Sequence, residues 1–83
     1  MTHQSFAVLL VPDPDVGGFT VMVPAIPEIV TEGDTEEHAL AMAQEAIVLY
    51  LGYAIDHGLP LPAEPVSPVL RSVDVPVPIP VGR

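Results

Sequence analysis

The apolar run over residues 39–55 constrains the fold of this chain more than any other feature, because only Gln44, Glu45 and Gly52 within it are not apolar. A run of this length without proline is typical of a helix. One apolar stripe at helical spacing would pack on a sheet, and it comprises Leu40, Ala43, Ile47, Tyr50, Leu51 and Ala54. A second stripe on another side comprises Met42, Ala46, Leu49 and Tyr53. Since one sheet covers only the first stripe, the second predicts an oligomer interface, in a dimer at least.

Both ends of this helix carry capping signals. Asp34 and Thr35 are each suitable as the N-cap residue. With Asp34 at the N-cap, Glu37 would stand at the third helical position of a capping box. The helix is predicted to end at Gly58, because glycine suits a left-handed C-cap.

Three short strands are predicted before the helix, over residues 6–11, 19–23 and 29–32. The first two are separated by a dense turn sequence of Asp, Pro and Gly over residues 13–18. The second strand stops at the Pro-Ala-Ile-Pro sequence of residues 24–27, because proline cannot donate to a β-ladder. Strands this close in sequence pair in antiparallel fashion, which predicts an antiparallel β-meander.

The part of the chain after the helix is rich in proline, with seven of the 11 prolines in residues 59–83. Residues 59–68 are predicted to form an extended linker. Residues 69–75 alternate well enough to form a last strand, and Pro76 limits anything beyond them to a sheet edge. A strand–helix–strand crossover makes this last strand parallel to the strand that it joins. The sequence therefore predicts a single α+β domain over residues 1–83.

The charge of the chain is strongly negative: 11 acidic residues face two basic ones, which gives a net charge of −9. A protein that binds nucleic acid needs several cations against the phosphates, so direct binding of DNA or RNA is not expected. A basic protein partner would be attracted. The alternative is that the charge only maintains solubility.

The small size of the chain, 83 residues, leaves it a thin margin of stability. Disulfides cannot add to it, because the chain has no cysteine. The three histidines lie far apart in sequence, so no metal site is expected. Oligomerisation therefore remains as the way in which this small domain would gain stability. The N-terminal residues do not resemble a signal peptide, and the longest apolar run falls short of the roughly 20 residues of a membrane span. We therefore expect a soluble cytoplasmic protein that does not enter a membrane.

Few residues of this sequence suggest catalysis. It has no glycine-rich phosphate loop, no Gly-x-Ser-x-Gly motif and no cysteine nucleophile. Asp13 and Asp15 are interpreted as turn-forming residues, and His38 as a surface or capping residue of the first helical turn. No catalytic residue, cofactor or metal is predicted.

Two segments carry a resemblance to a known family. The first is Gly-Phe-Thr-Val-Met-Val-Pro-Ala-Ile-Pro over residues 18–27, and the second is Thr-Glu-Gly-Asp-Thr-Glu-Glu-His-Ala-Leu-Ala-Met-Ala-Gln-Glu-Ala-Ile over residues 31–47. Together with the Leu-Pro-Leu-Pro sequence after the helix and the Val-Asp-Val-Pro ending, they resemble the HicB-like antitoxins over nearly the whole chain. One departure is that Glu28 and Ile29 stand where the family usually has Gly, often followed by Cys.

The resemblance implies a partial ribonuclease-H-like fold with strand order 3-2-1-4 and the helix on one face. It does not imply nuclease activity, because such catalysis needs a carboxylate in the first strand, and residues 6–11 contain none. It implies instead that the protein neutralises a small, basic, RNA-cleaving toxin of the HicA type. Many members also carry a C-terminal DNA-binding module, which we do not expect in a chain that ends at Arg83.

Two other functions remain as alternatives to an antitoxin. One is an orphan homo-oligomeric domain of the same fold with a structural or small-ligand role, and the other is a metal-dependent nuclease. Under the antitoxin hypothesis, the acidic residues near the first turn and the third strand are predicted to bind the toxin: Asp13, Asp15, Glu28, Glu32, Asp34, Glu36 and Glu37. The alternative interpretation of these residues is that they cap the helix and solvate turns.

Overall fold

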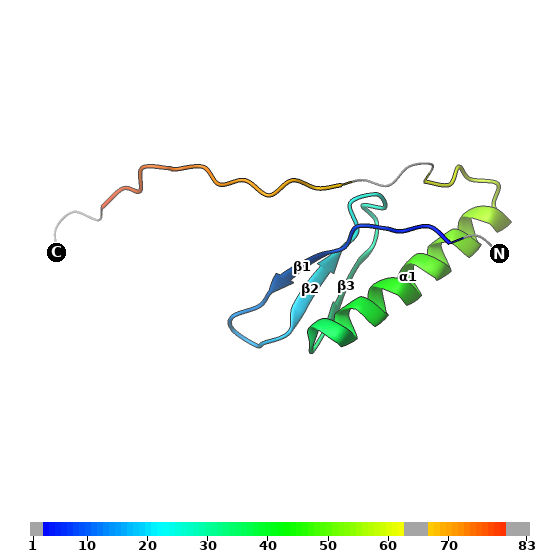
Figure 1. Cartoon of the computed structure of the whole chain (residues 1–83), viewed down its shortest axis with the longest axis horizontal. Helices are drawn as coiled ribbons and strands as arrows, with labels where there is room; N and C mark the ends of the chain where they lie inside the picture. Colours follow the sequence, from blue (N-terminus) through cyan, green and yellow to red (C-terminus); the bar gives the residue numbers. More distant parts are fainter. Residues whose placement is uncertain (1–2, 63–66, 80–83) are drawn as a thin grey trace.

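The structure is a computed structural model that describes residues 3–62 and 67–79. It contains the strands β1 (Leu9–Pro12), β2 (Phe19–Met22) and β3 (Val30–Gly33), followed by the helix α1 (Glu36–Asp56). The strands form an antiparallel sheet in the order β1-β2-β3, and α1 lies across one face of it (Figure 1). The predicted α+β class, the meander and the long helix are therefore confirmed.

The turn between β1 and β2 forms where the sequence predicts it. The Asp13 carboxylate accepts hydrogen bonds from the backbone N–H groups of Asp15, at 2.9 Å, and Val16, at 3.3 Å. Gly17 and Gly18 have φ angles of 80° and 78°, which other residues rarely adopt. A bond of 3.0 Å from Asp13 N–H to the Gly18 carbonyl closes the turn. Local side-chain bonding and glycine together reverse the chain.

The strands differ from the predicted ones mainly at their ends. β1 begins at Leu9 rather than at residue 6, and residues 3–8 have no ladder partner. β1 also includes Pro12, one residue beyond the predicted range of 6–11. Pro12 fits because successive strand residues face opposite edges. The Asp13 N–H donates to the Gly18 carbonyl just before β2, so Pro12 turns its nitrogen away from β2. β2 ends one residue early, at Met22, and β3 is shifted to residues 30–33.

The core lies between the sheet and α1. Its buried hydrophobic residues are Val21, Val23, Ile26, Ile29, Ala39, Ala43, Ile47 and Ala54. Most of the helix residues among them are alanines, so the helix backbone can come close to the sheet. The approach is closest at Gly33, where an added Cβ would lie 2.9 Å from the carbonyl carbon of His38 and would overlap the backbone of Ala39. Small side chains therefore set the spacing between β3 and α1.

The ends of α1 decide between the capping alternatives. Thr35 is the N-cap residue, and its hydroxyl accepts from the His38 N–H at 3.0 Å. At the other end Gly58 has a φ of 65°, and the Leu59 N–H donates to the Ala54 carbonyl at 2.8 Å. The helix ends at Asp56 with His57 as its C-cap residue, and the predicted left-handed glycine, Gly58, follows it. Of the two N-cap candidates the structure selects Thr35.

The last predicted strand is not present in the structure. Residues 67–79 form no strand, and their large apolar side chains are 67–88% exposed: Val69, Leu70, Val73, Val75, Val77 and Ile79. In Figure 1 this segment runs past the sheet in the general direction of β1. Pro68, Pro76 and Pro78 donate no backbone hydrogen bond, which weakens any ladder here. The strand over residues 69–75 and the order 3-2-1-4 are therefore not shown.

Helix α1 also meets the length and composition of a membrane span. The core helix of a small domain can meet the same test, and α1 packs on the sheet through Ala39, Ala43, Ile47 and Ala54. The sequence-based expectation that the protein does not enter a membrane stays a prediction.

Candidate protein-interaction surfaces

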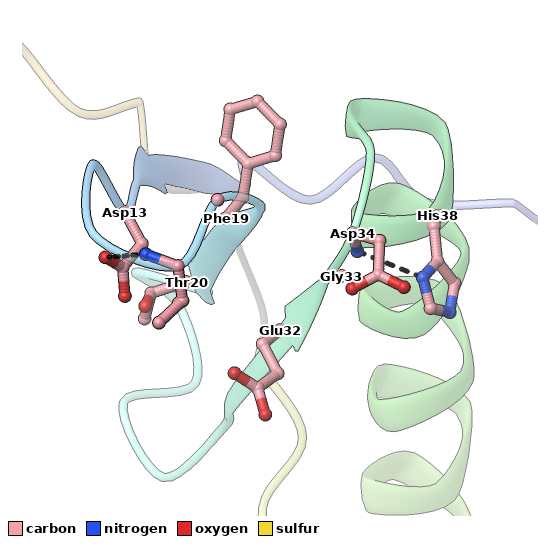
Figure 2. A pocket seen from close by; sticks show the side chains of 9 residues that line it. Asp13, Phe19, Thr20, Glu32, Gly33, Asp34 and His38 are labelled. Carbon is pink, nitrogen blue, oxygen red and sulfur yellow. Dashed lines mark hydrogen bonds between the residues drawn. The ribbon is translucent and has the colours of Figure 1, made fainter.

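An acidic hollow lies at the end of the sheet where the β1–β2 turn, β3 and the start of α1 come together (Figure 2). Its volume is about 410 Å³, and it is lined by Asp13, Val16, Gly17, Phe19, Thr20, Glu32, Gly33, Asp34 and His38. The three carboxylates come from three segments: the turn, β3 and the connection to α1. No lysine or arginine lines the hollow, so its electrostatic potential is negative.

Hydrogen bonds at the start of α1 fix the residues on the right-hand side of this hollow in Figure 2. The Nδ1 atom of His38 accepts from the backbone N–H of Asp34 at 3.1 Å, while the His38 N–H donates to Thr35 Oγ1 at 3.0 Å. This arrangement resembles a capping box in which histidine replaces Glu or Gln. The interpretation of His38 as a capping residue is thus confirmed, and it requires Nδ1 to be unprotonated.

Replacing Thr35 by Ala is expected to destabilise the protein by about 1 kcal/mol, because the N-cap hydroxyl is lost. Thr35→Ser keeps that hydroxyl and should retain most of the stability. Urea unfolding followed by circular dichroism measures both. If Thr35→Ala and Thr35→Ser unfold at the same urea concentration, the hydroxyl contributes nothing and the capping assignment is wrong.

The structure gathers most of the predicted toxin-binding residues at this acidic end. Beyond the three in the hollow, Asp15 belongs to the same turn, and Glu36 and Glu37 form the first turn of α1. Glu28 is separate, because the β2–β3 connection lies at the opposite end of the sheet. Six of the seven side chains are exposed and Asp13 is half-buried, so their charges are open to a partner. Whether they bind a toxin stays a prediction.

A second hollow, larger and mainly apolar, lies between residues 3–8 and α1. Its volume is about 770 Å³, and it is lined by His3, Gln4, Phe6, Val8, Leu40, Ala43, Gln44, Ile47, Val48 and Leu51. The sequence placed Leu40 and Leu51 in the stripe that packs on the sheet. The structure leaves Leu40 45% exposed and Leu51 half-buried, because α1 sits mainly over β2 and β3. We call this hollow the apolar groove.

The predicted oligomer stripe is divided by the structure. Met42 and Ala46 are half-buried, whereas Leu49 is 67% and Tyr53 54% exposed. The Tyr53 ring stacks on the His57 ring with centroids 4.0 Å apart, so Tyr53 already has a partner in the last turn of its own helix. The role of this stripe in an oligomer stays a prediction.

Comparison with known proteins identifies a family for this chain. Residues 5–82 match the sequence profile of a family described as the HicB-like antitoxin of bacterial toxin–antitoxin systems. The chain belongs to this family. The earlier resemblance is therefore confirmed over nearly the whole chain.

Two curated antitoxins of Photorhabdus laumondii subsp. laumondii are similar to this HicB-like chain. Antitoxin HicB 2 is 62% identical over 34 residues, which cover 41% of this chain and 24% of the relative. Antitoxin HicB 1 is 41% identical over 64 residues, which cover 74% of this chain and 39% of the relative. The chain thus spans well under half the length of these relatives. No solved structure matches it.

The structure gives a physical reason for the two segments that identify the HicB-like family here. The Gly33-Asp34-Thr35 sequence joins β3 to α1, where glycine permits close contact and threonine caps the helix. The Pro-Ala-Ile-Pro sequence of residues 24–27 forms the connection from β2 to β3, and its Ile26 is buried in the core. Both segments have structural roles, and the first also carries Asp34 of the acidic hollow.

Within residues 3–62 and 67–79, no three His, Cys, Asp or Glu side chains are grouped so that they could hold a metal ion.

Proposed function

We propose that this domain binds and neutralises a small basic toxin of the HicA type, and that the acidic end of the sheet is the docking surface. The observation that carries the proposal is the convergence of exposed carboxylates from the turn, β3 and the start of α1 on one end of the molecule. Membership of an antitoxin family supports it. The net charge of −9 adds a favourable long-range field.

The mechanism is inhibition by masking. A toxin that cleaves RNA presents basic residues to the phosphates of its substrate. The same basic surface can dock on the carboxylates of Glu32, Glu36 and Glu37, after which RNA is excluded. The antitoxin needs no catalysis, cofactor or nucleic-acid contact of its own for this, and it acts where the toxin does, in the cytoplasm.

Replacing Glu32, Glu36 and Glu37 together by Gln is expected to slow association with a cognate HicA-type toxin by about tenfold at low salt, because electrostatic steering is lost. Glu28→Gln is the matched control, since Glu28 lies at the opposite end of the sheet. Stopped-flow mixing at several salt concentrations measures the rates. The salt dependence should flatten in the triple variant and stay steep in the control.

Two checks make this experiment decisive. Loss of Glu36 and Glu37 at the helix N-terminus removes about 0.3–1 kcal/mol of dipole interaction each, so thermal unfolding must show that the triple variant is folded. A control that slows association as much as the triple variant, or a triple variant with unchanged rates, places the interface elsewhere.

We also propose that a fourth strand completes the sheet at the outer edge of β1, which gives the strand order 3-2-1-4. The apolar groove supports this, because a strand beside β1 would lie against the exposed side of Leu40, Val48 and Leu51. The same apolar groove also agrees with the alternative function, in which the chain is a homo-oligomeric domain that binds no toxin. Co-purification with the product of the neighbouring gene distinguishes the two.

A further inference from the structure

Among residues 3–62 and 67–79, no strand pairs with the outer edge of β1, so this edge offers backbone groups for pairing. The Asp13 N–H donates to the Gly18 carbonyl just before β2, and successive residues of a strand face opposite edges, so Val11 and Leu9 also face β2. Leu10 therefore turns its backbone N–H and C=O groups away from β2, and Val8 would do the same if the strand continued by one residue before Leu9. The side chains of Val8 and Leu10 pack on the helix side of the sheet. This edge thus opens directly onto the apolar groove.

The segment over residues 73–79 has the pattern of a strand that can pair on one side only. Pro76 and Pro78 stand at alternate positions, so in a strand both would leave the same edge without a donor. The residues that alternate with these prolines, at positions 73, 75, 77 and 79, keep their N–H groups on the other edge. Their side chains share one face and are all apolar and exposed: Val73, Val75, Val77 and Ile79. We call this segment the arm.

The direction of pairing follows from the face that the apolar side chains must take. In an antiparallel pair, bonded residues stand directly opposite each other and point their side chains to the same face. Pairing of the arm with Val8 and Leu10 in this direction would place Val73, Val75 and Val77 in the apolar groove. In a parallel pair, bonded residues are offset by one position, so the same side chains would point away from the groove.

The arm of the same chain runs the wrong way for this pairing. In Figure 1 it passes the sheet in the general direction of β1, which is the parallel direction. The linker sequence before it contains Pro60, Pro62, Pro65 and Pro68, and such proline-rich segments favour extended chain over reversal. A second copy can present its arm in the opposite direction.

We propose that two copies of this chain exchange arms, each arm pairing antiparallel with the outer edge of β1 of the other copy and filling its apolar groove. A two-fold axis makes both contacts equivalent and closes the assembly as a dimer. The prolines then face outward and prevent a further strand from adding to the sheet. This fourth strand differs from the parallel, same-chain strand that the sequence suggested. The dimer does not depend on toxin binding.

Cysteine cross-linking tests the exchange, because the natural chain contains no cysteine. Bonded antiparallel pairs have Cα atoms about 5.5 Å apart, within the range of a disulfide. We would pair Val8→Cys or Leu10→Cys with cysteine at position 73, 75 or 77 of the same chain. The expected product on oxidation is a covalent dimer, with Val8 joining a later arm residue than Leu10 does. A disulfide within one chain, or the reverse order of partners, overturns the proposal.

Measurement of molecular mass by light scattering provides a second readout. The natural protein should have about twice the 8.8 kDa mass of the chain, and Val75→Asp with Val77→Asp should reduce it to 8.8 kDa. Val69→Asp, outside the arm, and Leu49→Glu, on the helix stripe, should leave the dimer intact. A natural protein of monomer mass overturns the proposal. So does a dimer that Leu49→Glu dissociates and the arm variant does not.

Discussion

Replacing Gly33 by Ala is expected to destabilise the protein by more than about 3 kcal/mol, which is comparable to the whole stability of a domain of this size. The added Cβ would overlap the backbone of Ala39 and would lie 2.9 Å from the carbonyl carbon of His38. These are backbone atoms of a helix, which cannot rotate away as a flexible side chain can. Relief would require β3 and α1 to separate, and that would open the core.

Gly52→Ala is the matched control for this substitution. Gly52 lies within α1, and an added Cβ there would meet no atom within 4 Å. Alanine is preferred over glycine in a helix by about 0.5–1 kcal/mol, so this variant should be slightly more stable than the natural protein. Urea unfolding of both variants gives the comparison. A Gly33→Ala protein as stable as the natural one contradicts the close packing of β3 on α1.

The elements that the sequence predicted correctly are those that local chemistry determines. The turn over residues 13–18 depends on an Asp carboxylate and two glycines that bond or bend within a few residues. Helix α1 is recognisable from its apolar run and from Gly58 at its end. The N-cap could not be chosen from sequence, because Asp34 and Thr35 are both good caps. Only the surrounding backbone decides between them.

The features that the sequence did not predict depend on contacts between distant segments. The contact of Gly33 with α1 requires the crossing of β3 and the helix to be known. The apolar groove was missed because Leu40 and Leu51 follow the sheet-facing spacing, while the helix is placed off centre toward β3. The sequence also did not predict that residues 67–79 form no strand. Alternation of apolar residues shows that a segment could be a strand, but it does not show whether the segment pairs with the edge of a sheet.

The candidate site was predicted more by charge than by position. Net charge indicated a basic partner, and the chain order placed the acidic residues near a turn and a helix start. The antiparallel sheet brings that turn and that helix start to one end and sends Glu28 to the other. Sequence separation alone could not tell Glu28 from Glu32. The register of β2 with β3 makes the difference.

Ile26→Ala is expected to destabilise the protein by about 2–5 kcal/mol, the usual range for a buried isoleucine. Ile26 lies in the irregular connection between β2 and β3, yet only 1% of it is exposed. It packs with Val23, Ile29 and Ile47, which join the connection to the helix. Its N–H donates to the Val23 carbonyl at 2.9 Å, and its carbonyl accepts from Ile29 at 3.0 Å. Truncation would leave a cavity that these bonded neighbours cannot fill.

Ile55→Ala is the control, because the same atoms are removed from a side chain that is 65% exposed on α1. Its effect should be within about 0.5 kcal/mol, with alanine's better helix propensity opposing the small loss of contact. Thermal and urea unfolding of the two variants measure the difference directly. Similar stabilities would mean that Ile26 is not a core residue. A large difference would show that the Pro-Ala-Ile-Pro sequence forms part of the core rather than merely ending a strand.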